Sequence, residues 1–199
     1  MNISDRRNLL ICGLTLTAAI MLAAIFGLMR PSAGGYDPAN PQTSLADIED
    51  TVSRNYPVAE ITNKMLGPSL SDPNTLVFDV RAPNEYIQSH LAGAHRIDPG
   101  MSAKDFIARF GPELKGKLVV FYCAVGVRSG EMLTRLEPAL ATSGVKAAAN
   151  LRGGIFRWFA DGGPVVTESG RANSVHSFDD AWGALLERTL KKSPRPARS

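Results

Sequence analysis

A cysteine followed by a short glycine-containing loop is the feature of this chain best suited to chemistry. The segment VVFYCAVGVRSGEM (119–132) ends an apolar run at Cys123, and Gly126, Arg128 and Ser129 follow within six residues. We predict a strand, a loop and then a helix. The loop amides and the first amides of such a helix have no partner inside the helix and converge near the sulfur. These donors and the cation Arg128 would stabilise a thiolate, which is the nucleophilic form of cysteine.

A cysteine at the end of a strand is also often no more than a small buried hydrophobic residue. Its position favours a nucleophile here, because Cys123 lies where the apolar run stops and not in its middle. The other cysteine, Cys12, lies in an apolar N-terminal segment, so we expect no disulfide partner for Cys123.

Alternating strand and helix patterns surround the cysteine. The run TLVFDV (75–80) predicts a strand, KLVVFYC (117–123) is typical of a central parallel strand buried on both faces, and AAANLRGG (147–154) predicts a weaker strand and a tight turn. Short helices are predicted at 45–54, 83–89, 102–110, 128–141 and 155–163. Ser44 with Asp47 and Ser102 with Asp105 have the spacing of helix caps for the first and the third of these. The fold class is therefore α/β, with a central, mainly parallel sheet flanked by helices. Such sheets carry their sites at the carboxyl ends of the strands, which is where Cys123 falls.

A further helix is expected near the C-terminus. Ser177 and Asp180 have the spacing of a capping box, which would start the helix there. Its apolar stripe comprises Phe178, Trp182, Leu185 and Leu186. We predict that this helix packs on the core.

Composition and charge argue against a nucleic-acid-binding protein. The net charge of +3 comes from the two ends, because residues 31–186 contain 14 basic and 17 acidic residues. A basic face is therefore not indicated, and we expect no nucleic-acid partner.

The N-terminal segment LLICGLTLTAAIMLAAIFGLM (9–29) contains 21 residues and no charge. That length is enough to span a bilayer, so we favour an uncleaved membrane anchor over a cleavable signal. Arg6 and Arg7 before it, against Arg30 after it, place the N-terminus in the cytoplasm. We therefore expect a bacterial inner-membrane protein whose domain faces the periplasm, or a soluble periplasmic protein if the segment is cleaved.

Three segments resemble the rhodanese family of sulfurtransferases. The loop CAVGVRS fits the family pattern CxxGxRS at Cys123, Gly126, Arg128 and Ser129. The segment VFDVRAPNEYIQSHLAGAHRID resembles the pattern near the start of the domain, although Ser89 stands where glycine is usual. The segment NLRGGIFRWFADGGPV resembles the closing motif. These motifs predict a rhodanese-like domain over residues 57–167, after an N-terminal segment (1–30) and a linker with a short helix (31–56), and before a C-terminal helix and basic tail (168–199).

The resemblance implies a reaction in two steps. Cys123 takes the outer sulfur of a donor such as thiosulfate, and the persulfide passes it to a thiol or to cyanide. The substrate-binding anion loop would comprise Ala124, Val125, Gly126, Val127, Arg128 and Ser129. Asp79, Arg81 and Glu85 are interpreted as a structural ion network that ties a strand to the next helix. We expect no cofactor and no metal site.

Two alternatives remain open. Cysteine phosphatases and arsenate reductases have related folds, but phosphatases place five residues between cysteine and arginine, whereas four separate Cys123 from Arg128. Tyr122 also stands where phosphatases usually carry histidine. The smaller loop favours sulfur over a phosphoryl group. The second alternative is a membrane-tethered docking or sulfur-carrier module.

Overall fold

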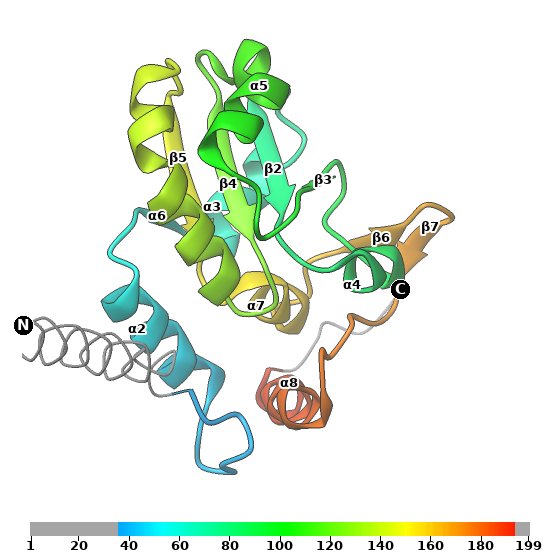
Figure 1. Cartoon of the computed structure of the whole chain (residues 1–199). Coiled ribbons are helices and arrows are strands. Elements are labelled where there is room, and N and C mark those ends of the chain that lie inside the picture. Colours follow the sequence, from blue (N-terminus) through cyan, green and yellow to red (C-terminus); the bar gives the residue numbers. More distant parts are fainter. Residues whose placement is uncertain (1–35, 194–199) are drawn as a thin grey trace, which may run out of the picture. The chain divides into compact units, whose positions relative to one another are not determined.

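A five-stranded parallel sheet forms the centre of the protein (Figure 1). The structure is a computed structural model, and it describes residues 36–193. The strand order is β1-β5-β4-β2-β3, and every neighbouring pair is parallel. The strands are β1 (Glu60–Ile61), β2 (Thr75–Asp79), β3 (His95–Arg96), β4 (Leu118–Tyr122) and β5 (Ala147–Leu151). The predicted α/β class with a parallel sheet is confirmed.

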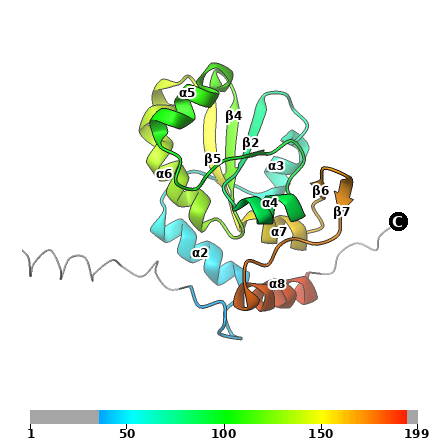
Figure 2. The same cartoon turned by 45° about the vertical axis from the view of Figure 1, so that its right-hand side comes forward.

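Helices cover the sheet and its carboxyl edge. They are α2 (Leu45–Asn55), α3 (Asn63–Ser69), α4 (Pro83–Gln88), α5 (Ala103–Leu114), α6 (Val127–Thr142), α7 (Gly154–Ala160) and α8 (Asp180–Lys192). Helices α5 and α6 lie on one face of the sheet, whereas α2, α7 and α8 lie together near the edge where the strands end (Figures 1 and 2). The central strand β4 therefore ends at the edge of the sheet near which α2, α7 and α8 lie.

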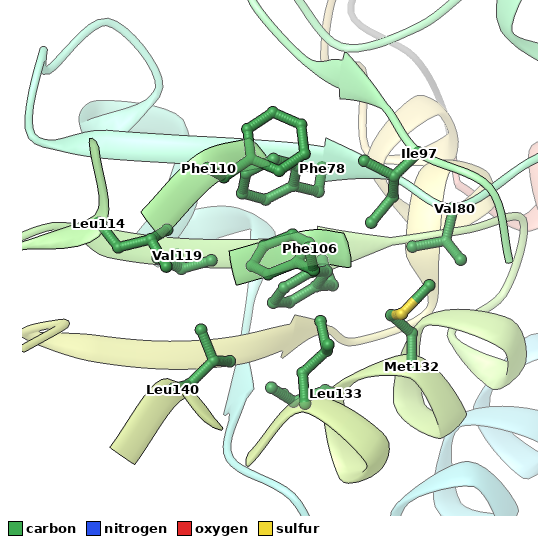
Figure 3. Packing of buried hydrophobic residues seen from close by; sticks show 12 residues of the cluster. Phe78, Val80, Ile97, Phe106, Phe110, Leu114, Val119, Met132, Leu133 and Leu140 are labelled. Atoms are coloured by element: carbon green, nitrogen blue, oxygen red, sulfur yellow. The ribbon is translucent and has the colours of Figure 1, made fainter. Parts of the chain in front are cut away.

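A hydrophobic cluster of buried residues lies between the sheet and the α5–α6 pair (Figure 3). Phe78 of β2 stacks on Phe121 of β4, with ring centroids 5.3 Å apart, and meets Phe106 and Phe110 of α5 edge-on. The other face of β4 is buried as well, since Val120 is fully covered. Burial on both faces explains why this strand reads as an uninterrupted apolar run. Each buried phenylalanine contributes about 2–3 kcal/mol to folding, so the strand that carries the cysteine is rigidly held.

Two of the three predicted helix caps are confirmed. The Ser44 side chain accepts the Asp47 amide at the start of α2, and the Ser102 side chain accepts the Asp105 amide at the start of α5. The third was wrong. Helix α8 is capped by Asp179, whose carboxylate accepts the Trp182 amide at 2.9 Å.

The cap of α8 also changes the interpretation of Phe178. This residue precedes the helix, is 54% exposed and therefore does not belong to the apolar stripe that packs on the core. Leu185 and Leu186 are buried as predicted. An aspartate competes better than serine for the free amides of a first turn, because its charge also favours the helix dipole.

A small hairpin between the domain and α8 was not predicted from the sequence. It consists of β6 (Val165–Thr167) and β7 (Gly170–Ala172), which pair antiparallel. His90 and Val166 exchange both backbone hydrogen bonds at 2.9 Å, which fastens the hairpin to the segment that follows α4.

The predicted membrane segment, residues 9–29, lies outside the described residues. Between Tyr36 and Ser193, no helix has the length and apolar character needed to span a bilayer.

Candidate active site

Cys123 lies directly after β4, at the carboxyl edge of the sheet and between neighbours β2 and β5. It is 1% exposed. Residues 123–126 turn the chain into α6, which begins at Val127. The strand, loop and helix predicted around the cysteine are therefore present, and the helix extends from one residue before to one residue after the predicted range of 128–141.

Gly126 makes the turn possible and contacts the sulfur. Its φ angle is 103°, in the left-handed region where a side chain is strained. Its amide donates a hydrogen bond to Sγ of Cys123 at 3.2 Å. A thiolate accepts this bond more strongly than a thiol does. The glycine therefore both bends the loop and stabilises negative charge on the sulfur.

The carbonyl groups of the loop are bound on its outer side by α7. The Ile155 amide donates to the Cys123 carbonyl at 2.9 Å, and the Phe156 amide donates to the Ala124 carbonyl at 3.0 Å. Gly154 permits this approach, since a Cβ there would lie 2.6 Å from the Ala124 carbonyl oxygen. The first free amides of α7 are thereby satisfied, and the orientation of the loop peptides is fixed.

The remaining loop amides are free to bind an anion. In the described part of the chain, the backbone N–H groups of Ala124, Val125, Val127 and Arg128 donate to no protein acceptor. The last two belong to the first turn of α6, where the helix dipole adds partial positive charge. Consecutive unpaired amides in a tight loop form an anion-binding nest. The loop that follows Cys123 thus carries unpaired amides, and their role in binding an anion stays a prediction.

Buried polar side chains of α6 and β5 hold the loop in place. The Ser129 hydroxyl donates to Oδ1 of Asn150 at 2.7 Å, and Nδ2 of Asn150 donates to the Gly126 carbonyl at 3.0 Å. Both side chains are fully buried. Ser129 therefore positions the loop rather than facing the sulfur. Asn150 was missed by sequence reasoning, although an asparagine within the apolar strand β5 was a signal of a buried hydrogen-bonding role.

Arg128 is fixed by an ion pair with Glu85 of α4. Its two terminal nitrogens donate to the two carboxylate oxygens at 2.7 and 2.8 Å, and Glu85 is 1% exposed. Burial would raise the pKa of Glu85, but the hydrogen bonds from Arg128 and from the Ala82 amide lower it below its ordinary value. Burial alone would lower the pKa of Arg128, but Glu85 and the neighbouring Cys123 raise it. The guanidinium thus binds the Glu85 carboxylate and interacts electrostatically with Cys123.

Asp79 and Arg81 form a separate buried pair. The nearest atoms of the two side chains are 2.7 Å apart, and both residues are fully buried. Arg81 also donates to the Ser89 carbonyl at 2.6 Å, and the Tyr122 hydroxyl donates to Asp79 at 2.6 Å. Burial and the adjacent Asp79 raise the pKa of Tyr122. The expected network is thus divided: this pair joins β2 to β4, whereas Glu85 binds the cysteine loop through Arg128.

Metal-ligating side chains do not gather at the site. Among residues 36–193, no cluster of three or more His, Cys, Asp or Glu side chains is arranged to hold a metal ion.

The Rhodanese-like domain family matches residues 62–161, which make up half of the chain. The chain belongs to the rhodanese-like domain family. This match includes Cys123, the anion loop, Glu85 and Asn150, and it ends before β6.

Rhodanese-like relatives differ in the activities for which they are named. The chain is 32% identical over 155 residues to a tRNA uridine(34) hydroxylase of Oceanobacillus iheyensis, covering 74% of this chain and 45% of that protein. It is 30% identical over 132 residues to a probable adenylyltransferase/sulfurtransferase, MoeZ, of Mycobacterium tuberculosis, covering 61% of this chain and 32% of that protein. The chain thus spans less than half the length of either relative.

Solved structures of rhodanese-related proteins are also similar. A thiosulfate sulfurtransferase from Pseudomonas aeruginosa superposes with a TM-score of 0.49 at 16% identity, covering 77% of this chain and 27% of that one. A rhodanese-related protein from Thermoplasma volcanium superposes with a TM-score of 0.44 at 25% identity, covering 55% of this chain and 99% of that one.

Proposed function

We propose that this rhodanese-like domain is a sulfurtransferase that carries a sulfane sulfur as a persulfide on Cys123. The observation that carries the proposal is the environment of Sγ: it accepts a hydrogen bond from the Gly126 amide, and other residues of the same loop carry amides that lack a protein acceptor. These donors match the single negative charge of a thiolate, and after transfer they match the terminal sulfur of a persulfide.

The reaction has two half-reactions. The Cys123 thiolate attacks the outer sulfur of a donor such as thiosulfate, the donor S–S bond breaks, and the leaving group departs with the electron pair. A thiolate or cyanide acceptor then attacks the terminal sulfur of the persulfide, and the Cys123 thiolate is restored. Each step is a displacement at sulfur, in which the leaving group takes over the negative charge of the nucleophile. The amides of Ala124 and Val125, which donate to no protein acceptor, would bind the developing charge.

Phosphoryl transfer receives less support from the site. Phosphoryl oxygens would be bound by N–H groups of the arginine, and the contacts with Glu85 already use one N–H on each terminal nitrogen of Arg128. The loop also has only four residues between Cys123 and Arg128. Phosphatase and arsenate reductase activities are therefore not our proposal.

Sulfur transfer is tested with the full-length protein in detergent. The wild type is incubated with thiosulfate and cyanide, thiocyanate is measured, and Cys123→Ser serves as the matched control. We expect thiocyanate only from the wild type. If neither protein forms thiocyanate but a protein persulfide donor loads Cys123, the domain is a sulfur-carrier module and not a thiosulfate enzyme.

Membrane attachment through residues 9–29 is a second proposal, and it is supported by the sequence alone. We propose that the domain, residues 57–167, faces the periplasm of a bacterium behind this anchor. Carbonate extraction of membranes, combined with determination of the N-terminal residue, tests it. Recovery of the protein in the soluble fraction, with a new N-terminus after residue 29, would contradict an uncleaved anchor.

A further inference from the structure

Phe178 lies outside the part of the chain that matches the family, yet it reaches the candidate active site. It belongs to residues 173–179, the segment between β7 and α8 that runs past α4 and α7 (Figure 2). Its ring lies over the guanidinium of Arg128, with 5.4 Å between Cζ and the ring centroid. The side chain is nevertheless 54% exposed, so most of its apolar surface is not used in folding.

The position of Phe178 is held at an energetic cost. Its φ angle is 72°, and it is the single non-glycine residue between Tyr36 and Ser193 with a positive φ. A bulky side chain in this region is strained by roughly 1–2 kcal/mol. Residues kept in such conformations are concentrated at functional sites, and here the conformation turns the ring towards Arg128.

Hydrogen bonds fasten the segment to α4, the helix that also carries Glu85. The Phe178 amide donates to Nδ1 of His176 at 2.9 Å, and the Asn84 side-chain amide lies 3.3 Å from Nε2 of the same ring. Gln88 donates to the Ser174 hydroxyl at 3.5 Å. The segment that carries Phe178 and the helix that carries Glu85 are therefore joined, and both contact Arg128.

The charges around the sulfur do not favour a small dianion. When Cys123 is a thiolate, Arg128 faces two negative charges, that of the sulfur and that of Glu85. Both terminal nitrogens of Arg128 already bind Glu85, and Phe178 covers one face of the guanidinium. Thiosulfate would bring two further negative charges. The persulfide of an uncharged organic thiol brings one, and its apolar body can pack on the exposed ring.

We propose that Phe178 is a specificity-determining residue that favours donors whose sulfane sulfur is carried by an organic thiol over thiosulfate. This inference rests on the proposed sulfurtransferase activity. In the step concerned, the Cys123 thiolate attacks the outer sulfur of R–S–S⁻. The S–S bond of the donor breaks, R–S⁻ leaves with the electron pair, and Cys123 retains the transferred sulfur as a persulfide. No oxidant or reductant is consumed.

Single-turnover loading of the full-length protein tests this proposal. The second-order rate constant for persulfide formation on Cys123 is measured by quenching and mass spectrometry, once with benzyl persulfide and once with thiosulfate. The quantity compared is the ratio of the two constants. We expect Phe178→Ala to lower this ratio about five-fold, the effect of losing one aromatic contact, through a slower reaction with benzyl persulfide.

Two further variants separate recognition from a structural role. Phe178→Tyr keeps the ring and should retain the wild-type ratio. Met65→Ala removes another exposed hydrophobic side chain, 61% exposed on α3, and should leave the ratio unchanged. The inference is wrong if Phe178→Ala lowers the rate constants for both donors equally or leaves both unchanged. It is also wrong if Phe178→Tyr lowers the ratio as much as Phe178→Ala does. If wild-type Cys123 gains sulfur from neither donor, the proposed function itself fails.

Discussion

Replacement of Glu85 by glutamine isolates the charge that holds Arg128 in place. Glutamine has the same shape and keeps an oxygen acceptor, but it loses the negative charge and presents an NH₂ group towards a cation. The carboxylate of Glu85 is 1% exposed and accepts two hydrogen bonds from Arg128, at 2.7 and 2.8 Å, and one from the Ala82 amide at 3.0 Å.

The structure sets the size of the stability that Glu85→Gln is expected to lose. Hydrogen bonds to charged groups contribute about 1 kcal/mol more than neutral ones, so weakening two of them costs about 2 kcal/mol. The cost stays below the 3–5 kcal/mol typical of breaking a fully buried pair, because the Arg128 side chain is 26% exposed and water can hydrate it. In a domain of this size, that loss lowers Tm by about 4–8 °C.

The loss should also depend on pH. The pKa of Glu85 is lowered in the folded protein, so its stabilising contribution is complete above the unfolded pKa of about 4.3 and is lost as the pH falls through the lower folded value. The difference in unfolding free energy between wild type and Glu85→Gln should therefore be largest near neutral pH and shrink below about pH 4.3.

Urea unfolding of the two proteins between neutral and acid pH measures this difference. Glu113→Gln is the matched control, because Glu113 is exposed on α5 and forms no ion pair within residues 36–193. The reasoning is refuted if Glu85→Gln is as stable as the control at neutral pH, or if the loss is the same at both ends of the pH range.

Two more substitutions test the support of the loop. Gly154→Ala should cost more than about 2 kcal/mol and abolish sulfur transfer, because the added Cβ meets the Ala124 carbonyl 2.6 Å away at a φ of 54°. Gly67→Ala is the control, because its Cβ meets nothing within 4 Å, and it should be neutral or slightly stabilising in urea unfolding. If both variants lost the same free energy of unfolding, the argument would be contradicted. Ser129→Ala leaves Oδ1 of buried Asn150 without its donor and should cost about 1–3 kcal/mol, measured in the same way; no loss would mean that the loop does not depend on this network.

Local pattern was enough to predict the elements around the cysteine. Both faces of β4 are buried, so its apolar run was readable as a strand, and Ser44 and Ser102 cap the helices that their spacing predicted. The sequence also predicted that Cys123, Gly126 and Arg128 belong to one strand-to-helix connection, because they are neighbours in the chain.

Contacts between segments that lie far apart in the chain could not be predicted from local sequence patterns. The pairing of Arg128 with Glu85 joins residues 43 positions apart, and the sequence analysis instead grouped Glu85 with Arg81, its neighbour in the sequence. The bond between Asn150 and the Gly126 carbonyl depends on β5 lying beside β4, which a single sequence does not specify. Phe178 was misassigned to a helix face because serine and aspartate both occur where α8 could begin.

The most direct test of the account is the mass of the protein after exposure to a sulfane-sulfur donor. Wild-type protein is treated with thiosulfate or with benzyl persulfide, digested without reducing agent and compared with Cys123→Ser. We predict that the peptide containing Cys123 gains the mass of one sulfur atom, that cyanide removes it, and that the variant gains none. An unmodified Cys123 with both donors, or equal sulfur uptake by Cys123→Ser, would contradict the claim that this cysteine carries the transferred sulfur.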